Sequence, residues 1–290
     1  VFQLAKLKKK ITHLSADINN FSNLNSIFHR YQPEIVFHLA AQALVMKSYE
    51  SPLDTFQTNV LGTANVLECI RHSGSVKAAV IITSDKCYKN KESDNLQAYR
   101  ETDELGGFDP YSASKGCAEL IVGSYTASFL KGKVPVASTR AGNVMGGGDW
   151  SQDRIIPDAI KALQKNVPVG IRNPTYVRPW QHVLEPLAGY LMLGAKLYHE
   201  DASADNKYSD AWNFGPPSHS IVAVQEIVEK LIALWGSGSW EHTKDSRMHP
   251  ETKMLSLDSR KAQRHLGWAS KLDLSTALRL TAEWYKQYKQ

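Results

Sequence analysis

The segment Glu34–Ala41 constrains the fold of this chain more than any other stretch. It is apolar at nearly every position, and strands of that kind are buried on both faces, as in a parallel sheet covered by helices. Ala78–Thr83 and Val134–Arg140 have the composition of two further strands. The sequence therefore predicts an α/β protein with a parallel sheet at its centre.

Helical segments separate these predicted strands. Apolar residues recur at helical spacing in Phe21–Tyr31, and Pro52–Arg71 has a proline in its first turn. Asp109 is the predicted N-cap of a helix over Pro110–Leu130. Together with a further short strand expected at Ile11–Leu14, strands and helices alternate. This alternation predicts a doubly wound sheet, which binds ligands at the carboxyl ends of its strands.

Beyond Gly148 the alternation loosens and the elements become shorter. We expect residues 1–150 to form the main domain and residues 151–290 to form mainly a smaller lobe over the carboxyl edge of the sheet. Some elements of this lobe should return to the first domain. The expected helices are Ile155–Leu163, Val183–Tyr198, Ile221–Trp235, Leu257–Leu266 and Leu272–Tyr285, and the expected strands are Val169–Ile171 and Trp212–Gly215.

Composition excludes several classes of protein. The chain is 42% hydrophobic and 22% charged with a net charge of +5, which is ordinary for a globular protein. It has no dense basic face with interleaved aromatics, so we predict no nucleic-acid partner. No apolar run reaches the roughly eighteen residues of a membrane helix, so we predict no membrane association. The histidines lack metal-binding spacing, and three cysteines without a CxxC motif indicate a reducing, cytoplasmic compartment.

Tyr111 and Lys115 are four residues apart near the start of a predicted helix, so their side chains share one face. A phenol has an unperturbed pKa of about 10 and needs help to act as a base near neutral pH. A nearby ammonium group supplies that help because it favours the phenolate. The same spacing recurs at Tyr285 and Lys289, where we interpret it as chance. The pair alone therefore leaves a structural interpretation open.

A hydroxyl, an acid and an amine directly follow the predicted strand Ala78–Thr83, in Ser84, Asp85 and Lys86. Opposite Tyr111 and Lys115, a strand-end hydroxyl can hold the same substrate oxygen. The combination indicates oxidation of a secondary alcohol beside a hydride acceptor. Once a sugar carbon is a ketone its neighbouring C–H is acidified, and Asp85 with Lys86 can then eliminate water. Asp-Lys is also common in plain turns, so the dipeptide alone does not decide the matter.

Seven short motifs occur in a fixed order along the chain: His38-Leu-Ala-Ala-Gln42, Thr58-Asn-Val-Leu-Gly-Thr63, Thr83-Ser-Asp-Lys-Cys-Tyr88, Asp109-Pro-Tyr-Ser-Ala-Ser-Lys115, Arg140-Ala-Gly-Asn-Val144, Gly147-Gly-Asp-Trp150 and Arg178-Pro-Trp-Gln-His182. With them the chain resembles the extended short-chain dehydrogenase/reductases, and within that family the CDP-glucose 4,6-dehydratases, from about Ile11 to Trp268. Asp85-Lys86 and the Gly-Gly-Asp-Trp stretch carry the finer resemblance, because other sugar-nucleotide 4,6-dehydratases usually have Asp-Glu at that strand end.

The resemblance implies a Rossmann-type domain that holds NAD+ and converts CDP-D-glucose to CDP-4-keto-6-deoxy-D-glucose, for deoxysugar or O-antigen-type polysaccharide synthesis. Tyr111, with Lys115 and Ser84, would take the proton of the glucose 4-hydroxyl while a hydride passes to the nicotinamide. Asp85 would protonate the departing 6-hydroxyl. Lys86 would either remove the C5 proton or stabilise an enolate electrostatically. The hydride then returns to C6 with no net use of cofactor.

The resemblance also implies binding residues. Besides Tyr111 and Lys115, the NAD contacts would be Asp17 and Ile18 beside the adenine, Leu39, Ala40, Ala41 and Gln42 along the pyrophosphate and ribose, and Thr58 near the nicotinamide. The CDP-glucose contacts would be Asn143, Arg178 and Asn213, with Arg247 and His249 as weaker candidates whose alternative is a solvated loop. His38 is interpreted as a hydrogen-bonded strand histidine.

One part of the family pattern is absent from the sequence. The family opens with a strand and a Gly-x-x-Gly-x-x-Gly turn whose amides hold a pyrophosphate, and these 290 residues contain no such stretch. Because the chain begins at Val1 with its catalytic motifs intact, we expect the printed sequence to lack the first strands and the glycine-rich loop of the family.

Three alternative functions remain open, and the same comparison implies that the protein is an oligomer. The chain is alternatively another nucleotide-sugar dehydratase, an epimerase or reductase of nucleotide sugars, or an inactive remnant. The resemblance further implies a homo-oligomer, at least a dimer, built on the helices at Pro52–Arg71 and Pro110–Leu130.

Overall fold

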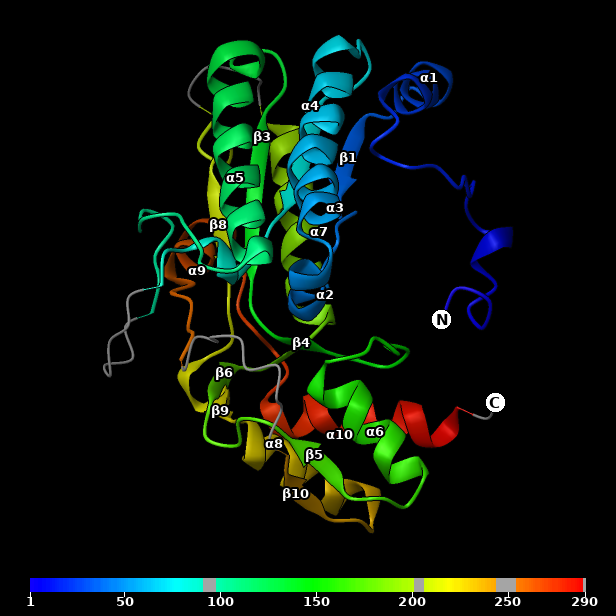
Figure 1. Cartoon of the computed structure of the whole chain (residues 1–290). Helices are drawn as coiled ribbons and strands as arrows, with labels where there is room; N and C mark the ends of the chain where they lie inside the picture. Colours follow the sequence, from blue (N-terminus) through cyan, green and yellow to red (C-terminus); the bar gives the residue numbers. More distant parts are fainter. Residues whose placement is uncertain (91–97, 201–205, 244–253, 289–290) are drawn as a thin grey trace.

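A four-stranded parallel sheet lies at the centre of the molecule (Figure 1). The structure, a computed structural model, describes residues 1–90, 98–200, 206–243 and 254–288. The strands run in the order β1 (Ile35–His38), β2 (Ala78–Ile82), β3 (Val136–Ala141) and β8 (Ala211–Phe214). The predicted α/β fold with a parallel sheet is confirmed.

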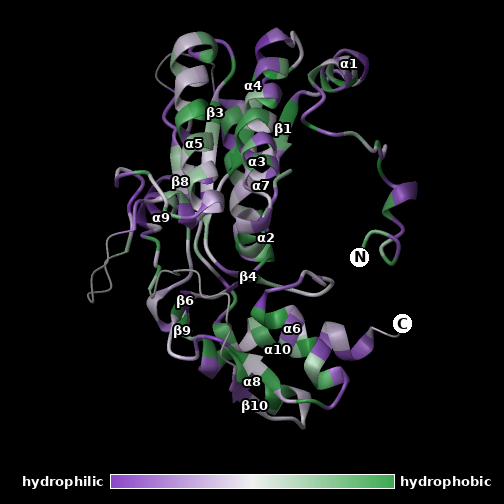
Figure 2. Cartoon of the chain, in the orientation of Figure 1, coloured by the Kyte–Doolittle hydropathy of each residue, from purple (hydrophilic) through white to green (hydrophobic). Residues whose placement is uncertain are grey.

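Helices cover both faces of this sheet, as the continuous apolar strands require. On one face lie α1 (Phe21–Tyr31), α4 (Gly62–His72) and α5 (Pro110–Tyr125), and their buried residues form one hydrophobic core with β2. On the other face lie α7 (Leu184–His199) and α9 (Arg260–Leu266), which form a second core with β2, β3 and β8. The hydropathy colouring in Figure 2 shows β1 as hydrophobic between these layers.

A smaller body lies beyond the carboxyl ends of the strands, in the lower half of Figure 1. A third hydrophobic core joins its three helices, which are α6 (Ile155–Gln164), α8 (Val224–Trp235) and α10 (Leu274–Gln287). Its strands pair two by two: β4 (Val144–Met145) with β7 (Gln181–His182), β5 (Val169–Ile171) with β10 (Trp240–His242), and β6 (Val177–Pro179) with β9 (Ile221–Ala223).

Several short elements connect these layers: the 3-10 turns η1 (Leu7–Lys9), η3 (Asp85–Cys87) and η5 (Ser218–Ser220), the short helices α2 (Val45–Glu50) and α3 (Pro52–Phe56), and the π-helical turns η2 (Gln57–Leu61) and η4 (Thr126–Leu130). None of the helices in the described ranges combines the length and the apolar character that crossing a membrane requires.

The helix expected over Pro52–Arg71 is divided. It forms α3, η2 and α4 in succession, because a π-helical turn interrupts it at Gln57–Leu61. Asn59 in this turn is buried, and its side chain bonds Gln42 and Ser114 instead of facing solvent. Such π turns frequently occur at functional sites.

Three further expectations about elements are wrong. The helix expected over Ile221–Trp235 begins only at Val224, because Ile221–Ala223 forms β9, which pairs with β6. Ile11–Leu14 forms no strand. Ile11 and Leu14 are exposed, and within the described residues this segment pairs with no other strand, while β1 pairs with β2 alone. The helix expected over Leu257–Leu266 begins only at Arg260. The chain before it is extended, because Asp258 N and Ser256 O bond the backbone of Tyr99.

His38, the last residue of β1, is buried beside α4. Its Nε2 lies 3.0 Å from Thr63 Oγ1, which itself donates to Asn59 O. Burial, with the nearby Lys115 ammonium, lowers the pKa of His38 to about 4. The expected hydrogen-bonded strand histidine is therefore confirmed.

His38 should make the free energy of unfolding depend on pH between about 6.5 and 4. The unfolded chain takes up this proton at the higher pH, so it binds more protons in that window and stability falls as the pH falls. The full effect is about 3 kcal/mol. Urea unfolding at pH 7 and 4.5 should show a smaller loss for His38→Gln than for the wild type, with exposed His199→Gln as control. An equal loss in all three proteins would contradict this assignment.

Candidate active site

A cavity of about 300 Å³ lies where the carboxyl ends of β2 and β3 meet the smaller body. Its wall includes residues from both parts of the chain. Six of the predicted site residues line it: Ser84, Asp85, Lys86, Tyr111, Asn143 and Arg178. Four segments far apart in the sequence thus meet at the carboxyl edge of the sheet, which is where ligands bind in such folds.

The end of β2 turns sharply at Ser84. Its Oγ accepts from Lys86 N at 3.2 Å, which caps η3, and donates to Asp85 Oδ1 at 3.0 Å. Asp85 is only 4% exposed and lines the cavity wall; among the described residues its second oxygen, Oδ2, has no hydrogen-bond partner. Burial raises the pKa of Asp85, against the opposing charges of Lys86 and Arg178. A raised pKa favours the protonated carboxyl, which can donate a proton.

The start of α5 places Tyr111 beside this turn. Asp109 caps the helix by accepting from Ser112 N at 2.9 Å, and Pro110 occupies the first helical position. Tyr111 lines the cavity together with Ser84. Burial raises the pKa of Tyr111 to about 12, while the nearby hydroxyl of Ser84 acts to lower it. The two reactive segments therefore lie side by side.

Lys115 lies one turn further along the same face of α5. Burial lowers the pKa of Lys115 to about 8, and its Nζ donates to Ile82 O at 3.3 Å, at the end of β2. An ammonium with this pKa remains mostly protonated at neutral pH. It can therefore stabilise a phenolate at Tyr111.

Gly142, which follows β3, allows the end of that strand to approach Asp85 in η3 closely. A Cβ at this position would lie 3.1 Å from Asp85 Oδ2 and 2.7 Å from Pro179 Cγ. Any larger side chain would displace the carboxyl group or the proline. Asn143 follows in the cavity wall, with its backbone carbonyl accepting from Gln181 N at 3.1 Å.

Arginine side chains of the smaller body also line the cavity. Arg178 is buried, stacks on Tyr176 at 5.5 Å from its ring centroid, and donates to Val177 O. Arg154 and Arg172 also line the cavity and were missed by the sequence analysis. Arg154 pairs with Asp149 of the Gly-Gly-Asp-Trp motif at 3.1 Å, so this motif could have pointed to it. Arg172 lies in none of the motifs, and nothing in the sequence pointed to it.

The other predicted residues lie outside the cavity wall. Asp17 is exposed and accepts from Asn19 N, and Ile18 packs against Gly62. At the end of β1, Leu39 and Ala40 are exposed, Ala41 and Thr58 are half-buried, and the Gln42 side chain bonds Thr55 and Leu44. Asn213 is fully buried, and its amide bonds Tyr88, Tyr99 and Asp258. Arg247 and His249 fall outside the described residues.

Asn59 is a third residue that the sequence analysis did not select. Its Nδ2 donates to Ser114 Oγ at 2.9 Å and to Gln42 O at 3.0 Å, and its Oδ1 accepts from Gln42 N. It thus ties the end of the β1 segment to α5 between Tyr111 and Lys115. The motif Thr58–Thr63 contained this residue, but nothing in its spacing distinguished Asn59 from Thr58.

Comparison with known proteins agrees with this geometry. The sequence model described as GDP-mannose 4,6 dehydratase matches residues 2–281. The chain belongs to this family. CDP-glucose 4,6-dehydratase of Salmonella typhimurium is 45% identical to it over 296 residues, an alignment that covers 99% of the chain and 80% of the relative.

Solved structures of low sequence identity share the fold of this family member. UDP-glucuronic acid 4-epimerase from Bacillus cereus, in complex with UDP-glucuronic acid and NAD, superposes with a TM-score of 0.83 at 21% identity, covering 99% of this chain and 85% of that one. dTDP-glucose 4,6-dehydratase from Streptomyces venezuelae, with NAD bound, gives a TM-score of 0.79 at 22% identity, covering 94% and 78%. The Rossmann-type fold expected from the sequence is confirmed.

Removing the cap of α5 should disturb the site. Asp109→Ala should lower the free energy of unfolding by about 1–2 kcal/mol, because Ser112 N loses its acceptor, and Tyr111 should lose its fixed position. Asp273→Ala is the matched control, since Asp273 caps α10 by accepting from Thr276 N outside the cavity. Both variants should lose similar stability in urea unfolding, while only Asp109→Ala should reduce turnover. Equal turnover in the two variants would contradict the role of the cap.

Proposed function

We propose that this protein is a hydro-lyase that removes water from CDP-D-glucose to give CDP-4-keto-6-deoxy-D-glucose through an internal redox cycle on NAD+. The observation that carries the proposal is the buried carboxyl of Asp85, which has a raised pKa and an unpartnered oxygen beside Tyr111. An enzyme that only oxidises an alcohol has no need of an acid there. The 45% identity to CDP-glucose 4,6-dehydratase supports the choice of substrate.

Tyr111 acts as the base for the sugar 4-hydroxyl. Its contact with Ser84 places two oxygens around one substrate oxygen, so that Ser84 orients the hydroxyl whose proton Tyr111 takes. Lys115 contributes its positive charge from one helical turn away. Since its surroundings as a whole, burial foremost, raise the pKa of the phenol to about 12, that charge is necessary for the phenolate to form near neutral pH.

Asp85 and Lys86 carry the dehydration. Asp85, whose burial favours the protonated form by raising its pKa, gives its proton to the 6-hydroxyl as that group leaves as water. Lys86 lies at the cavity wall on the same turn. There its neutral amine takes the C5 proton, and the ammonium that forms stabilises the negative charge left on the sugar.

NAD+ fits the nicotinamide end of this site. A cationic ring beside Tyr111 would lower the raised pKa of the buried phenol, and Tyr111, Lys115 and Thr58 would hold that end. Asp17, Ile18 and the segment 39–42 would flank the remainder, where Leu39 and Ala40 are exposed. When bound, NAD+ takes a hydride from one sugar carbon and supplies it to another.

Arg178, Arg172 and Asn143 bind the nucleotide diphosphate of the substrate. Arg178 is held by stacking on Tyr176, and its planar guanidinium suits a phosphate. An epimerase is the alternative, because a 4-epimerase shares the fold. The two activities differ in their need for the acid at Asp85.

Incubation with CDP-glucose and NAD+ should give a product lighter by one water in mass spectrometry. Asp85→Asn should reduce its formation at least about a hundredfold, within the range of general acid catalysis. Asp103→Asn, a change away from the cavity wall and from α3 and α5, is the control and should retain activity. An epimerised product of unchanged mass, formed equally well by Asp85→Asn, would contradict dehydration.

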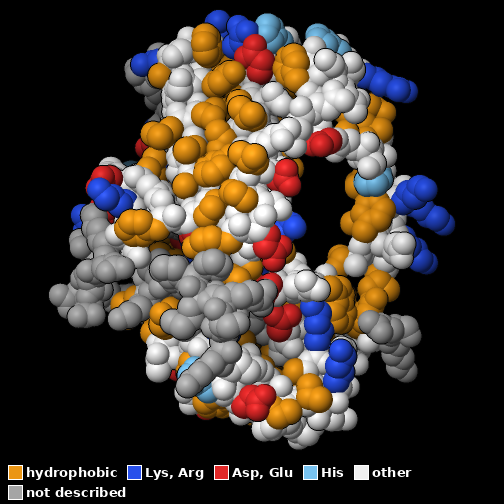
Figure 3. Space-filling view, in the orientation of Figure 1, with side chains coloured by type: hydrophobic (Ala, Val, Ile, Leu, Met, Phe, Trp, Pro, Cys, Tyr) orange, Lys and Arg blue, Asp and Glu red, His pale blue; other side chains and the backbone are white. Residues whose placement is uncertain are grey.

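We propose further that two copies of the chain associate through α3, η2 and α5. Figure 3 shows hydrophobic side chains gathered on the face that these elements form with α4. Leu53, Leu61 and Leu120 are 82%, 59% and 63% exposed there. An exposed apolar face of this kind is typical of an interface between copies.

Leu53→Asp with Leu120→Asp should convert the protein to a monomer in sedimentation velocity, because each carboxylate would be buried unpaired in the interface. Leu191→Asp on α7 is the control: Leu191 is 63% exposed but lies on a helix of the opposite face. Dissociation by Leu191→Asp alone, or an unchanged oligomer in the double variant, would contradict this interface.

We infer a cytoplasmic location from the cysteines. Cys69, Cys87 and Cys117 are all free. Buried free thiols are typical of reducing compartments, where nucleotide sugars are also made.

A further inference from the structure

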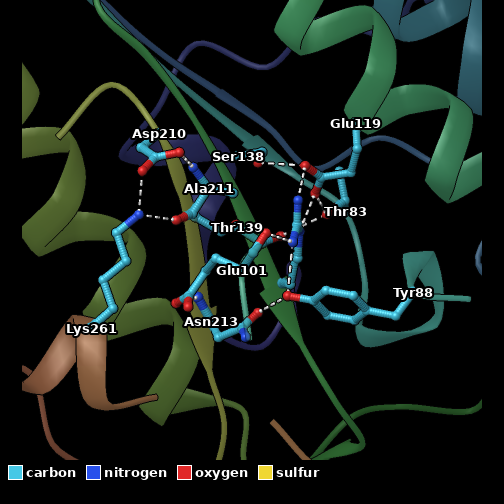
Figure 4. Close-up of polar contacts among 11 residues, drawn as sticks. Thr83, Tyr88, Glu101, Glu119, Ser138, Thr139, Asp210, Ala211, Asn213 and Lys261 are labelled. Atoms are coloured by element: carbon cyan, nitrogen blue, oxygen red, sulfur yellow. Dashed lines mark hydrogen bonds and ion pairs between the residues drawn. The ribbon is translucent and has the colours of Figure 1, made fainter. Parts of the chain in front are cut away.

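A buried ion pair lies directly behind the active-site cavity. Arg140 on β3 and Glu119 on α5 pair at 2.7 Å between Nη2 and Oε2, and a second bond joins Nε to Oε1 at 2.9 Å. Both side chains are less than 5% exposed. Figure 4 shows Glu119 reaching from its helix toward the strands. Neither residue lines the cavity, so neither can contact a substrate.

Glu119 belongs to the reactive face of α5. Tyr111, Lys115 and Glu119 are spaced by four residues, so they lie one above another on the helix. Besides Arg140, the carboxylate accepts from Thr83 Oγ1 and from Ser138 Oγ. Thr83 immediately precedes Ser84. One carboxylate therefore holds the helix of Tyr111 against the strand end that bears Ser84.

Arg140 extends this connection to the other side of the turn. Its Nη1 donates to Tyr88 OH at 2.8 Å, and Tyr88 OH donates to Asn213 Oδ1 at 2.7 Å. The guanidinium also stacks on the Tyr88 ring at 4.8 Å. Tyr88 follows η3, which contains Asp85 and Lys86. The segment Ser84–Cys87 is therefore held at one end by Thr83, which bonds Glu119, and at the other by Tyr88, which bonds Arg140. Asn213, expected at the substrate, instead completes this network (Figure 4).

We infer that Glu119 and Arg140 are the positioning pair of the site: together they hold Tyr111 and Lys115 in register with Ser84 and Asp85, and Glu119 sets the electrostatic environment of Lys115. This inference rests on the proposed function for its catalytic consequence. Its structural and electrostatic parts do not depend on which substrate is bound.

Charges facing Lys115 come from three elements. Glu119 on α5 favours the ammonium, Cys87 of η3 would favour it only as a thiolate, and His38 on β1 opposes it when protonated. Burial raises the pKa of the Cys87 thiol well above its usual value, and His38 has a pKa of about 4, so both are neutral at pH 7. Glu119 is then the charged group that acts on Lys115 among these three.

The test measures the titration of Lys115 in the free protein by NMR of lysines labelled with 13C at the ε-carbon, with Lys115→Met to assign the resonance. Glu119→Gln keeps the shape of the side chain and removes its charge, so the midpoint should fall by about one unit. Ser138→Ala removes a hydrogen bond to Glu119 without changing charge, and should leave the midpoint in place. A midpoint unchanged in Glu119→Gln would overturn the electrostatic assignment.

Turnover tests the positioning part. Thr83→Val keeps both charges and removes the hydroxyl link to Glu119; it should lower kcat at least tenfold, with KM and the Lys115 midpoint nearly unchanged. An unchanged kcat would overturn positioning. If Glu119→Gln does not fold, Glu119→Gln with Arg140→Gln leaves no unpaired buried charge; it should still lower the midpoint, but by less, because the opposing charge of Arg140 is lost as well. A wild type that makes no product from CDP-glucose would refute the proposed function while leaving the NMR result valid.

Discussion

The buried ion pair between Glu119 and Arg140 is the interaction on which the site depends most. Burying either charge alone is unfavourable by several kcal/mol, so the pair exists only where every polar atom finds a partner. Here the carboxylate accepts four bonds, from Arg140, Thr83 and Ser138. Hydrophobic residues of equal volume would hold α5 against the sheet as well, but they would not fix its register. The requirement for complete pairing restricts the helix to one position relative to the strand ends.

Burial then sets the chemistry of the groups that this register brings together. It raises the pKa of Asp85 and Tyr111 and lowers that of Lys115. The same desolvation therefore produces an acid that holds its proton, a phenol that resists losing its own, and an ammonium close to its titration point. A phenol that resists losing its proton conflicts with catalysis near pH 7, and an ammonium one helical turn away on the same face is the group that can favour its phenolate.

The sequence predicted the features that depend on local pattern. Apolar runs identified β1, β2 and β3, the Asp109-Pro110 pair identified the start of α5, and the spacing of Tyr111 and Lys115 identified its reactive face. It did not predict features that arise only when distant segments meet. Arg172 and Arg154 reach the cavity through packing of the smaller body, and Asn213 faces Arg140 and Tyr88 instead of the substrate. Ile11–Leu14 has a strand's composition, but pairing with a neighbour is what makes a strand.

The central claim, that one site oxidises, dehydrates and reduces the same sugar, is tested most directly with an isotope. CDP-glucose carrying deuterium at C4 should yield a 4-keto-6-deoxy product with that deuterium at C6, seen by NMR, with no net reduction of NAD+. Retention follows if the same site removes the hydride and returns it before the sugar leaves. Loss of the deuterium to solvent, or its appearance in free NADH, would contradict the account.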